Sequence, residues 1–161
     1  MNRLAIGGLA ATFLTASAAA ETPLDVLGET VTIKVSGQET DGAVSVVEVH
    51  TPPGLGAPPH ANSREVIVFY VAEGTVAFTV EGETVEKQQG VVVLIPRGVM
   101  HGYVNVGDAP SRLVITFAPG GFERFFDEVH ERQFELPDDM QAFVELATKY
   151  GMELGAPPEE E

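Results

Sequence analysis

Four histidines have the chemistry most useful for a functional site in this chain: His50, His60, His101 and His130. Neutral imidazole nitrogens bind divalent transition-metal ions and also donate or accept hydrogen bonds. His60 follows a segment, residues 51–59, that is rich in proline and glycine. Such a segment forms neither a helix nor a central strand. We therefore expect a loop that carries His60 to the mouth of whatever the strands enclose.

The other histidines are less informative. His50 ends a predicted strand, so it either lines the same cavity or faces solvent. His130 lies between Glu128 and Glu131 on a predicted helix, where we expect a solvated or ion-paired side chain. His60 and His101 also have a simpler interpretation, as cavity residues that hydrogen-bond to an amide or a water molecule.

Several kinds of reactive site are missing from the sequence. There is no cysteine, which excludes disulfides, thiolate metal sites and cysteine nucleophiles. No G-x-S-x-G elbow or phosphate-binding loop occurs. The formal charge of −15 disfavours nucleic acids and anionic membranes as partners. Tyr70, Tyr103 and the apolar strand residues predict a mostly hydrophobic pocket, which suits a small organic or aromatic molecule.

The first twenty residues differ in composition from the rest. Arg3 precedes an apolar run, residues 4–14, and three alanines at 18–20 precede Glu21. This order of a positive region, a short apolar region and small residues predicts a cleaved signal peptide over residues 1–20. The mature protein is then periplasmic or secreted and has no membrane contact after cleavage. A buried N-terminal helix or an uncleaved anchor is the alternative.

Residues 21–118 have the pattern of an all-β domain. Alternating or continuous apolar runs with turn residues between them predict about eight or nine short strands, typical of a sandwich or small barrel. The clearest are 30–35, 43–50, 67–71, 75–80, 84–87, 91–95, 101–106 and 112–118. The run at 91–95 is apolar throughout, which predicts a strand buried on both faces.

Residues 119–152 predict two amphipathic helices that cover a barrel edge or mouth, or pack against a second protomer. The first shows apolar residues at helical spacing from Phe122 to Val129, and the second follows Pro137 and stops near Gly151. Residues 153–161 are predicted to be a disordered acidic tail.

Two segments carry a resemblance to a known family. Residues 90–105 fit G-x5-P-x-G-x2-H-x3-N at every position, from Gly90 to His101 and Asn105. Residues 54–74 keep the spacing of G-x5-H-x-H-x4-E-x6-G, although Asn62 replaces its second histidine and Ile67 its glutamate. The chain thus resembles the cupin superfamily. The resemblance implies a double-stranded β-helix jelly-roll barrel with a ligand cavity, here with two C-terminal α-helices, and a possible homodimer.

Short phrases along the chain look most like the quercetin 2,3-dioxygenase-like subgroup of single-domain cupins. They are Ser63-Arg64-Glu65, Phe69-Tyr70-Val71, Ala118-Pro119-Gly120-Gly121-Phe122 and Tyr150-Gly151.

The resemblance also implies a metal site, which here is degenerate. The family's ligand positions map onto His60, Asn62, Ile67 and His101. An amide oxygen is a weak neutral donor and Ile67 cannot coordinate, so we expect no cofactor or only a weakly bound Fe, Mn, Ni, Zn or Cu ion. Glu65 could add a carboxylate if it shared a strand face with Ile67. Otherwise Glu65 lies at the surface, solvated or paired with Arg64.

Three hypotheses follow for function. The first is a ligand-binding cupin without redox catalysis, in which the side chains of His60, Asn62, Ile67, His101 and Tyr103 contact a small organic molecule. The second is a metal-dependent dioxygenase or isomerase that uses His60, His101 and either Glu65 or water. The third is a structural interaction domain whose cavity is filled by its own side chains. Many unrelated functions share the cupin scaffold, so the fold alone does not decide among them.

Overall fold

The computed structural model describes residues 22–155. The predicted signal peptide and residues 156–161 of the predicted tail lie outside the described residues. The strands and helices are β1 (Leu24–Val26), β2 (Glu29–Val35), β3 (Ser45–Thr51), β4 (His60–Asn62), β5 (Val66–Glu73), β6 (Thr75–Val80), β7 (Glu83–Gln88), β8 (Val92–Ile95), β9 (His101–Asn105), β10 (Ser111–Ala118), α1 (Glu123–Arg132), α2 (Met140–Lys149) and β11 (Met152–Leu154).

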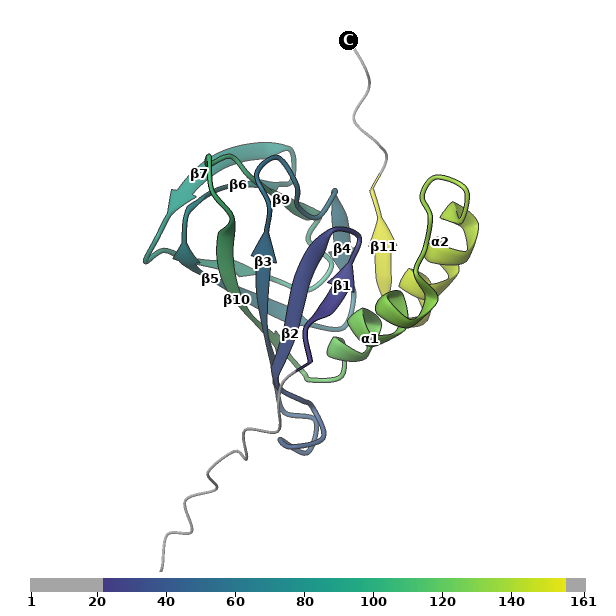
Figure 1. Ribbon diagram of the computed structural model, residues 1–161. Coiled ribbons are helices and arrows are strands. Elements are labelled where there is room, and N and C mark those ends of the chain that lie inside the picture. The colour runs from purple at the N-terminus through teal and green to yellow at the C-terminus, as the bar shows by residue number, and fades with distance from the viewer. Residues whose placement is uncertain (1–21, 156–161) are drawn as a thin grey trace, which may run out of the picture.

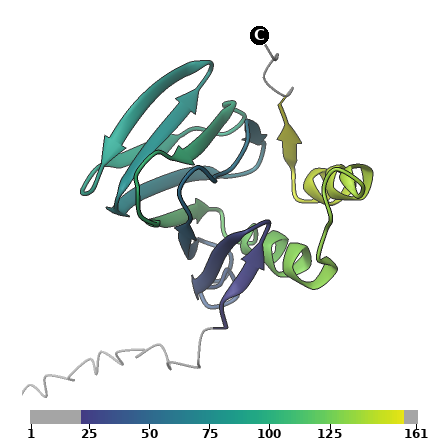
Figure 2. The ribbon, with the colours of Figure 1, turned by 45° about the horizontal axis from the view of Figure 1, so that its top comes forward.

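The strands form two antiparallel sheets that enclose the core, with both helices on one side of the barrel (Figures 1 and 2). One sheet has the order β1-β2-β3-β10-β5-β8, and the other has the order β11-β4-β9-β6-β7. Neighbours in each sheet are often far apart in sequence, as in a jelly roll. The predicted jelly-roll barrel with two C-terminal helices is confirmed.

In the larger sheet, every second side chain of a strand faces the core. Ile115 of β10 stands opposite Phe69 of β5 and Val47 of β3, and all three side chains are buried. Residues between them, such as Val114, point to the other face and are half-buried. Because successive strand side chains alternate between faces, this register sends one apolar row from each strand into the barrel.

The structure corrects two expectations about strands. β8 is an edge strand, so Val92 and Leu94 are 60% and 61% exposed rather than buried on both faces. β11 extends the folded part into the predicted tail, because Glu153 and Leu154 pair with Ala61 and His60. Both differences come from partners distant in sequence, which local composition does not report.

The helices close one end of the barrel against the β1–β2 hairpin and β11 (Figure 2). The start of α1 is fixed by the buried carboxylate of Glu123, which accepts hydrogen bonds from the backbone N–H groups of Gly37 (2.8 Å) and Gly121 (2.7 Å). None of the helices in the described part of the chain is long and apolar enough to cross a membrane.

Candidate functional site

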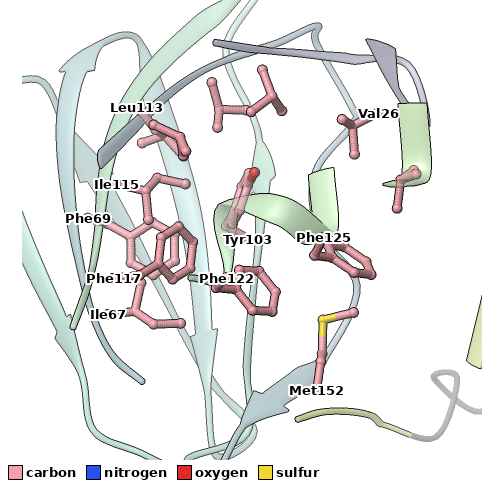
Figure 3. Packing of buried hydrophobic residues seen from close by; sticks show 14 of the residues in the cluster. Val26, Ile67, Phe69, Tyr103, Leu113, Ile115, Phe117, Phe122, Phe125 and Met152 are labelled. Atoms are coloured by element: carbon pink, nitrogen blue, oxygen red, sulfur yellow. The ribbon is translucent and has the colours of Figure 1, made fainter. Parts of the chain in front are cut away.

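A cavity of about 180 Å³ lies between the larger sheet and the helices. Figure 3 shows Phe122 and Phe125, at the start of α1, across from Phe117 and Ile115 of β10. The rings of Phe117 and Phe122 have centroids 4.9 Å apart. The walls are almost wholly aliphatic or aromatic, and the polar side chains on them within residues 22–155 are Glu29, His60 and Tyr103.

His60 reaches this cavity because the preceding loop is fastened along β9. The backbone N–H of Tyr103 donates to the carbonyl of Ala57 (3.0 Å), and that of Asn105 donates to the carbonyl of Leu55 (2.9 Å). Gly56 permits the contact, since a Cβ at this position would lie 2.0 Å from the carbonyl oxygen of Tyr103. The predicted loop thus continues the pairing of β4 along β9. It leads into β4, where His60 lies at the cavity wall.

His60 and His101 lie side by side. They are register partners in the β4–β9 pair, and their ring centroids are 4.4 Å apart. Nδ1 of His60 donates to the carbonyl of Pro58 (2.8 Å), and Nδ1 of His101 donates to that of Val99 (2.9 Å). A carbonyl only accepts, so each ring carries its proton on Nδ1 and keeps Nε2 as an acceptor.

Both rings are held neutral. Burial, followed by the neighbouring His101, lowers the pKa of His60 to about 4. Burial also lowers the pKa of His101. Nε2 of His101 is buried and has no hydrogen-bond partner in the described part of the chain.

The other expected site residues are divided between two environments. Ile67 and Tyr103 line the cavity, as His60 does, whereas Asn62 and His101 are buried nearby without forming its walls. Neither amide atom of Asn62 has a hydrogen bond of good geometry among residues 22–155, although the Asn62 side chain lies close enough to the Glu65 carboxyl to lower the pKa of that group. The buried Asn62 amide therefore interacts with Glu65 rather than with the contents of the cavity.

Glu65 is buried rather than at the surface. It precedes β5 rather than lying on it, so the alternation that would align it with Ile67 does not apply. Its side chain is buried beside a separate polar hollow that includes Arg64 and Arg124. Burial raises the pKa of the Glu65 carboxyl, although the positive charge of Arg64 acts in the opposite direction.

The sequence-based reasoning missed Glu29. Oε1 of Glu29 accepts hydrogen bonds from the hydroxyls of Thr51 (2.6 Å) and Tyr103 (2.9 Å). Burial raises the pKa of Glu29, although both hydrogen bonds act in the opposite direction. A signal was present, because Glu29 is in phase with Val31 and Ile33 and so belongs to the inward row of β2.

Comparison with known proteins identifies the family. Residues 47–117 match the family described as "Cupin domain". These residues form a cupin domain. Among curated proteins, none matches this sequence.

Solved cupin-fold structures are similar to this cupin over most of their own length. KdgF from Halomonas sp. is 24% identical, with 64% of this chain and 90% of that chain covered and a TM-score of 0.58. An RmlC-like cupin from Shewanella frigidimarina is 23% identical, with coverage of 63% and 86% and a TM-score of 0.53. A protein described as a predicted oxalate decarboxylase from Thermotoga maritima is 19% identical, with coverage of 62% and 94% and a TM-score of 0.56. At these identities the likeness concerns the fold alone, and the quercetin dioxygenase-like subgroup stays a prediction.

The residues of this cupin do not fit a tightly bound metal ion. Within residues 22–155, no three His, Cys, Asp or Glu side chains are grouped so that they could hold one. His60, His101 and Glu65 do not form such a group, and their use as a ligand set stays a prediction. Ile67 presents a hydrocarbon wall at the position of the family carboxylate, and Asn62 offers only a neutral amide. Zinc and iron sites normally use three or more strong ligands.

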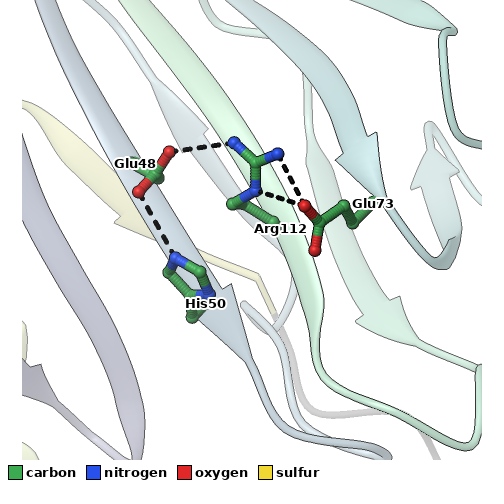
Figure 4. Close-up of polar contacts among 4 residues, drawn as sticks. All are labelled: Glu48, His50, Glu73 and Arg112. Atoms are coloured by element: carbon green, nitrogen blue, oxygen red, sulfur yellow. Dashed lines mark hydrogen bonds and ion pairs between the residues drawn. The ribbon is translucent and has the colours of Figure 1, made fainter.

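The remaining histidines lie away from the cavity. His50 is on the outer side of β3, where it contacts Glu48 at 3.3 Å (Figure 4). Arg112 on β10 forms ion pairs with the same Glu48 on β3 and with Glu73 on β5 (Figure 4). His130 is half-buried, and its Nδ1 accepts a hydrogen bond from the backbone N–H of Asp25 (3.0 Å), which fastens α1 to β1.

Proposed function

We propose that this chain is an exported cupin that binds a small organic molecule in its barrel cavity and does not catalyse a redox reaction. The observation that supports binding is the cavity itself, which is apolar on nearly all sides and has three polar side chains on its walls. Ligand sites in proteins commonly combine these two features. Export is inferred from the sequence of residues 1–20.

The size of the cavity limits the ligand. Its volume of about 180 Å³ is close to that of an engineered apolar cavity of roughly 150 Å³ that binds benzene. Sites for drug-sized molecules are larger, roughly 300–1,000 Å³. A molecule with one aromatic ring therefore suits this cupin better than a flavonol with three rings. This favours simple binding over the quercetin dioxygenase-like alternative.

A structural interaction domain predicts a barrel filled by its own side chains. The open volume beside Ile115, Phe117 and Phe122 argues against that hypothesis. A possible homodimer stays a prediction.

Titration of the mature protein with toluene, followed by NMR of its methyl groups, tests the proposal. We expect saturable shifts at one site per chain. Ile115→Phe fills the cavity and should weaken binding roughly ten-fold or more, which corresponds to about 1.4 kcal/mol. Val114→Phe is the matched control, because Val114 is the next residue of β10 and points to the outer face. Absence of saturable binding to the folded wild type would overturn the proposal.

A further inference from the structure

The polar side chains on the cavity walls share one property, which is that each presents a hydrogen-bond acceptor. Oε1 of Glu29 already accepts from Thr51 and Tyr103, while its Oε2 has no hydrogen bond with any of residues 22–155. The Tyr103 hydroxyl uses its proton on Glu29, so its oxygen keeps lone pairs for another group. His60 uses its proton on Pro58 and keeps Nε2 as an acceptor.

The carboxyl of Glu29 is the centre of this arrangement. Two hydroxyls from different strands, Thr51 on β3 and Tyr103 on β9, hold its position. Burial, and then the negative charge of Glu29, raises the pKa of Tyr103 well above the ordinary value. Tyr103 therefore stays protonated and continues to donate to Glu29.

A ligand must complement these acceptors, because a buried polar group without a partner costs about 1–3 kcal/mol. We propose that the cavity selects a molecule about the size of one aromatic ring that carries a hydroxyl or amino donor, and that Glu29 accepts its hydrogen bond. This inference rests on the proposed binding function and names the class of ligand for the same cavity. Tyr103 and Thr51 act as positioning residues for the carboxyl.

The negative charges of the protein limit the class of ligand further. An anionic ligand would offer hydrogen-bond acceptors to groups that are themselves acceptors. Its negative charge would also be repelled by the Glu29 carboxylate. The chain as a whole has a formal charge of −15, which also repels anions. Aromatic carboxylates should therefore be excluded even where their ring fits the cavity.

Four compounds of similar size separate the possibilities by isothermal titration calorimetry at pH 8. Phenol carries a neutral donor, benzylamine a cationic donor, toluene no donor and benzoate a negative charge. We expect phenol, benzylamine or both to bind roughly ten-fold more tightly than toluene, since a hydrogen bond to a charged acceptor contributes about 1.5–3 kcal/mol. We expect benzoate to bind more weakly than toluene or not at all.

Variants assign the preference to Glu29. Glu29→Gln should reduce the ratio of donor-ligand to toluene affinity to about two-fold or less. Tyr103→Phe keeps the ring and removes the positioning hydroxyl, so it should reduce the same ratio and supplies a second test if Glu29→Gln does not fold. Glu48→Gln is the matched control, because Glu48 lies on the outer face of the same sheet.

The two proposals fail in different ways. Toluene binding as tight as phenol and benzylamine binding, or tight benzoate binding, overturns the donor preference and leaves the binding cavity intact. An unchanged ratio in both folded variants also overturns the role of Glu29. Failure of all four compounds to bind folded wild type overturns the proposed function, and the ligand class with it.

Discussion

His60 and His101 stand opposite each other in the β4–β9 pair, with ring centroids 4.4 Å apart. Each ring donates from Nδ1 to a carbonyl two residues earlier in the chain. Two positive charges at about 4 Å would repel by roughly 4 kcal/mol at an effective dielectric constant near 20. The folded protein therefore favours neutral rings at both positions, and protonation of the pair should lower its stability.

The stability of the protein should fall between about pH 6.5 and pH 4 because of His60. Its pKa is lowered in the fold from 6.5 to about 4, so the unfolded chain takes up a proton at higher pH than the folded chain does. The contribution is fully present above pH 6.5 and is lost as the pH falls toward 4, with a magnitude of about 3 kcal/mol. Urea unfolding at pH 7, 5.5 and 4 measures it, with His60→Gln removing this part of the pH dependence.

His50→Gln provides the control, because His50 lies on the outer face and contacts Glu48. It should leave the loss of stability between pH 6.5 and 4 nearly as in wild type. Parallel stability curves for wild type and His60→Gln over this range would contradict the assigned role of His60.

Much of the fold could be predicted from residue order alone. Alternation identifies strands such as Thr75–Val80, which has the expected bounds. Three-residue strands give no such signal, and β4 exists because Asn62 pairs with Met152 while His60 pairs with His101. The exposure of Val92 and Leu94 could not be predicted either, because a continuous apolar run carries no alternation to separate an edge strand from a buried one.

The site was predictable where a motif fixes spacing and unpredictable where distant strands meet. The motif spacing led to His60 and His101, which the structure brings together. Tyr103 and Ile67 also reach the cavity wall. Glu29 is 74 residues from Tyr103 in sequence, so only the packing of the two sheets reveals their contact. Glu65 precedes β5, so alternation along that strand gives no basis for predicting where its side chain lies.

Replacing the two altered ligands should restore a metal site. In Asn62→His/Ile67→Glu, both new side chains join His60 and His101, which gives three imidazoles and one carboxylate. We expect near one zinc or nickel ion per chain after reconstitution, measured by elemental analysis, against far less in wild type. The metal should also raise the unfolding midpoint of the variant, because binding to the folded state stabilises it.

The control for this variant is Asn62→His/Ile67→Leu, which adds an imidazole and no carboxylate and should bind metal more weakly. Metal analysis of the wild type alone can contradict this account of the site. Near one tightly bound metal per chain in wild type, lost in His60→Ala/His101→Ala, would show that the residues of the wild-type site do hold a metal ion.

Gly56→Ala should damage both stability and binding from a position outside the cavity's polar centre. The added Cβ would lie 2.0 Å from the carbonyl oxygen of Tyr103 and 2.8 Å from its carbonyl carbon. Both are backbone atoms, so the loop must move away from β9 and lose the hydrogen bond from Tyr103 to Ala57. Overpacking of this kind costs about 1–3 kcal/mol or more, and displacement of the loop also moves His60.

Urea unfolding and toluene titration measure the two effects of Gly56→Ala. Gly107→Ala is the matched control, because the nearest atom to its added Cβ is 3.4 Å away and belongs to the side chain of Asn105. We expect its unfolding free energy to stay within about 0.5 kcal/mol of wild type and its toluene affinity to stay unchanged. Wild-type stability and affinity in Gly56→Ala would mean that the loop does not need its close contact with β9 to hold the cavity wall in place.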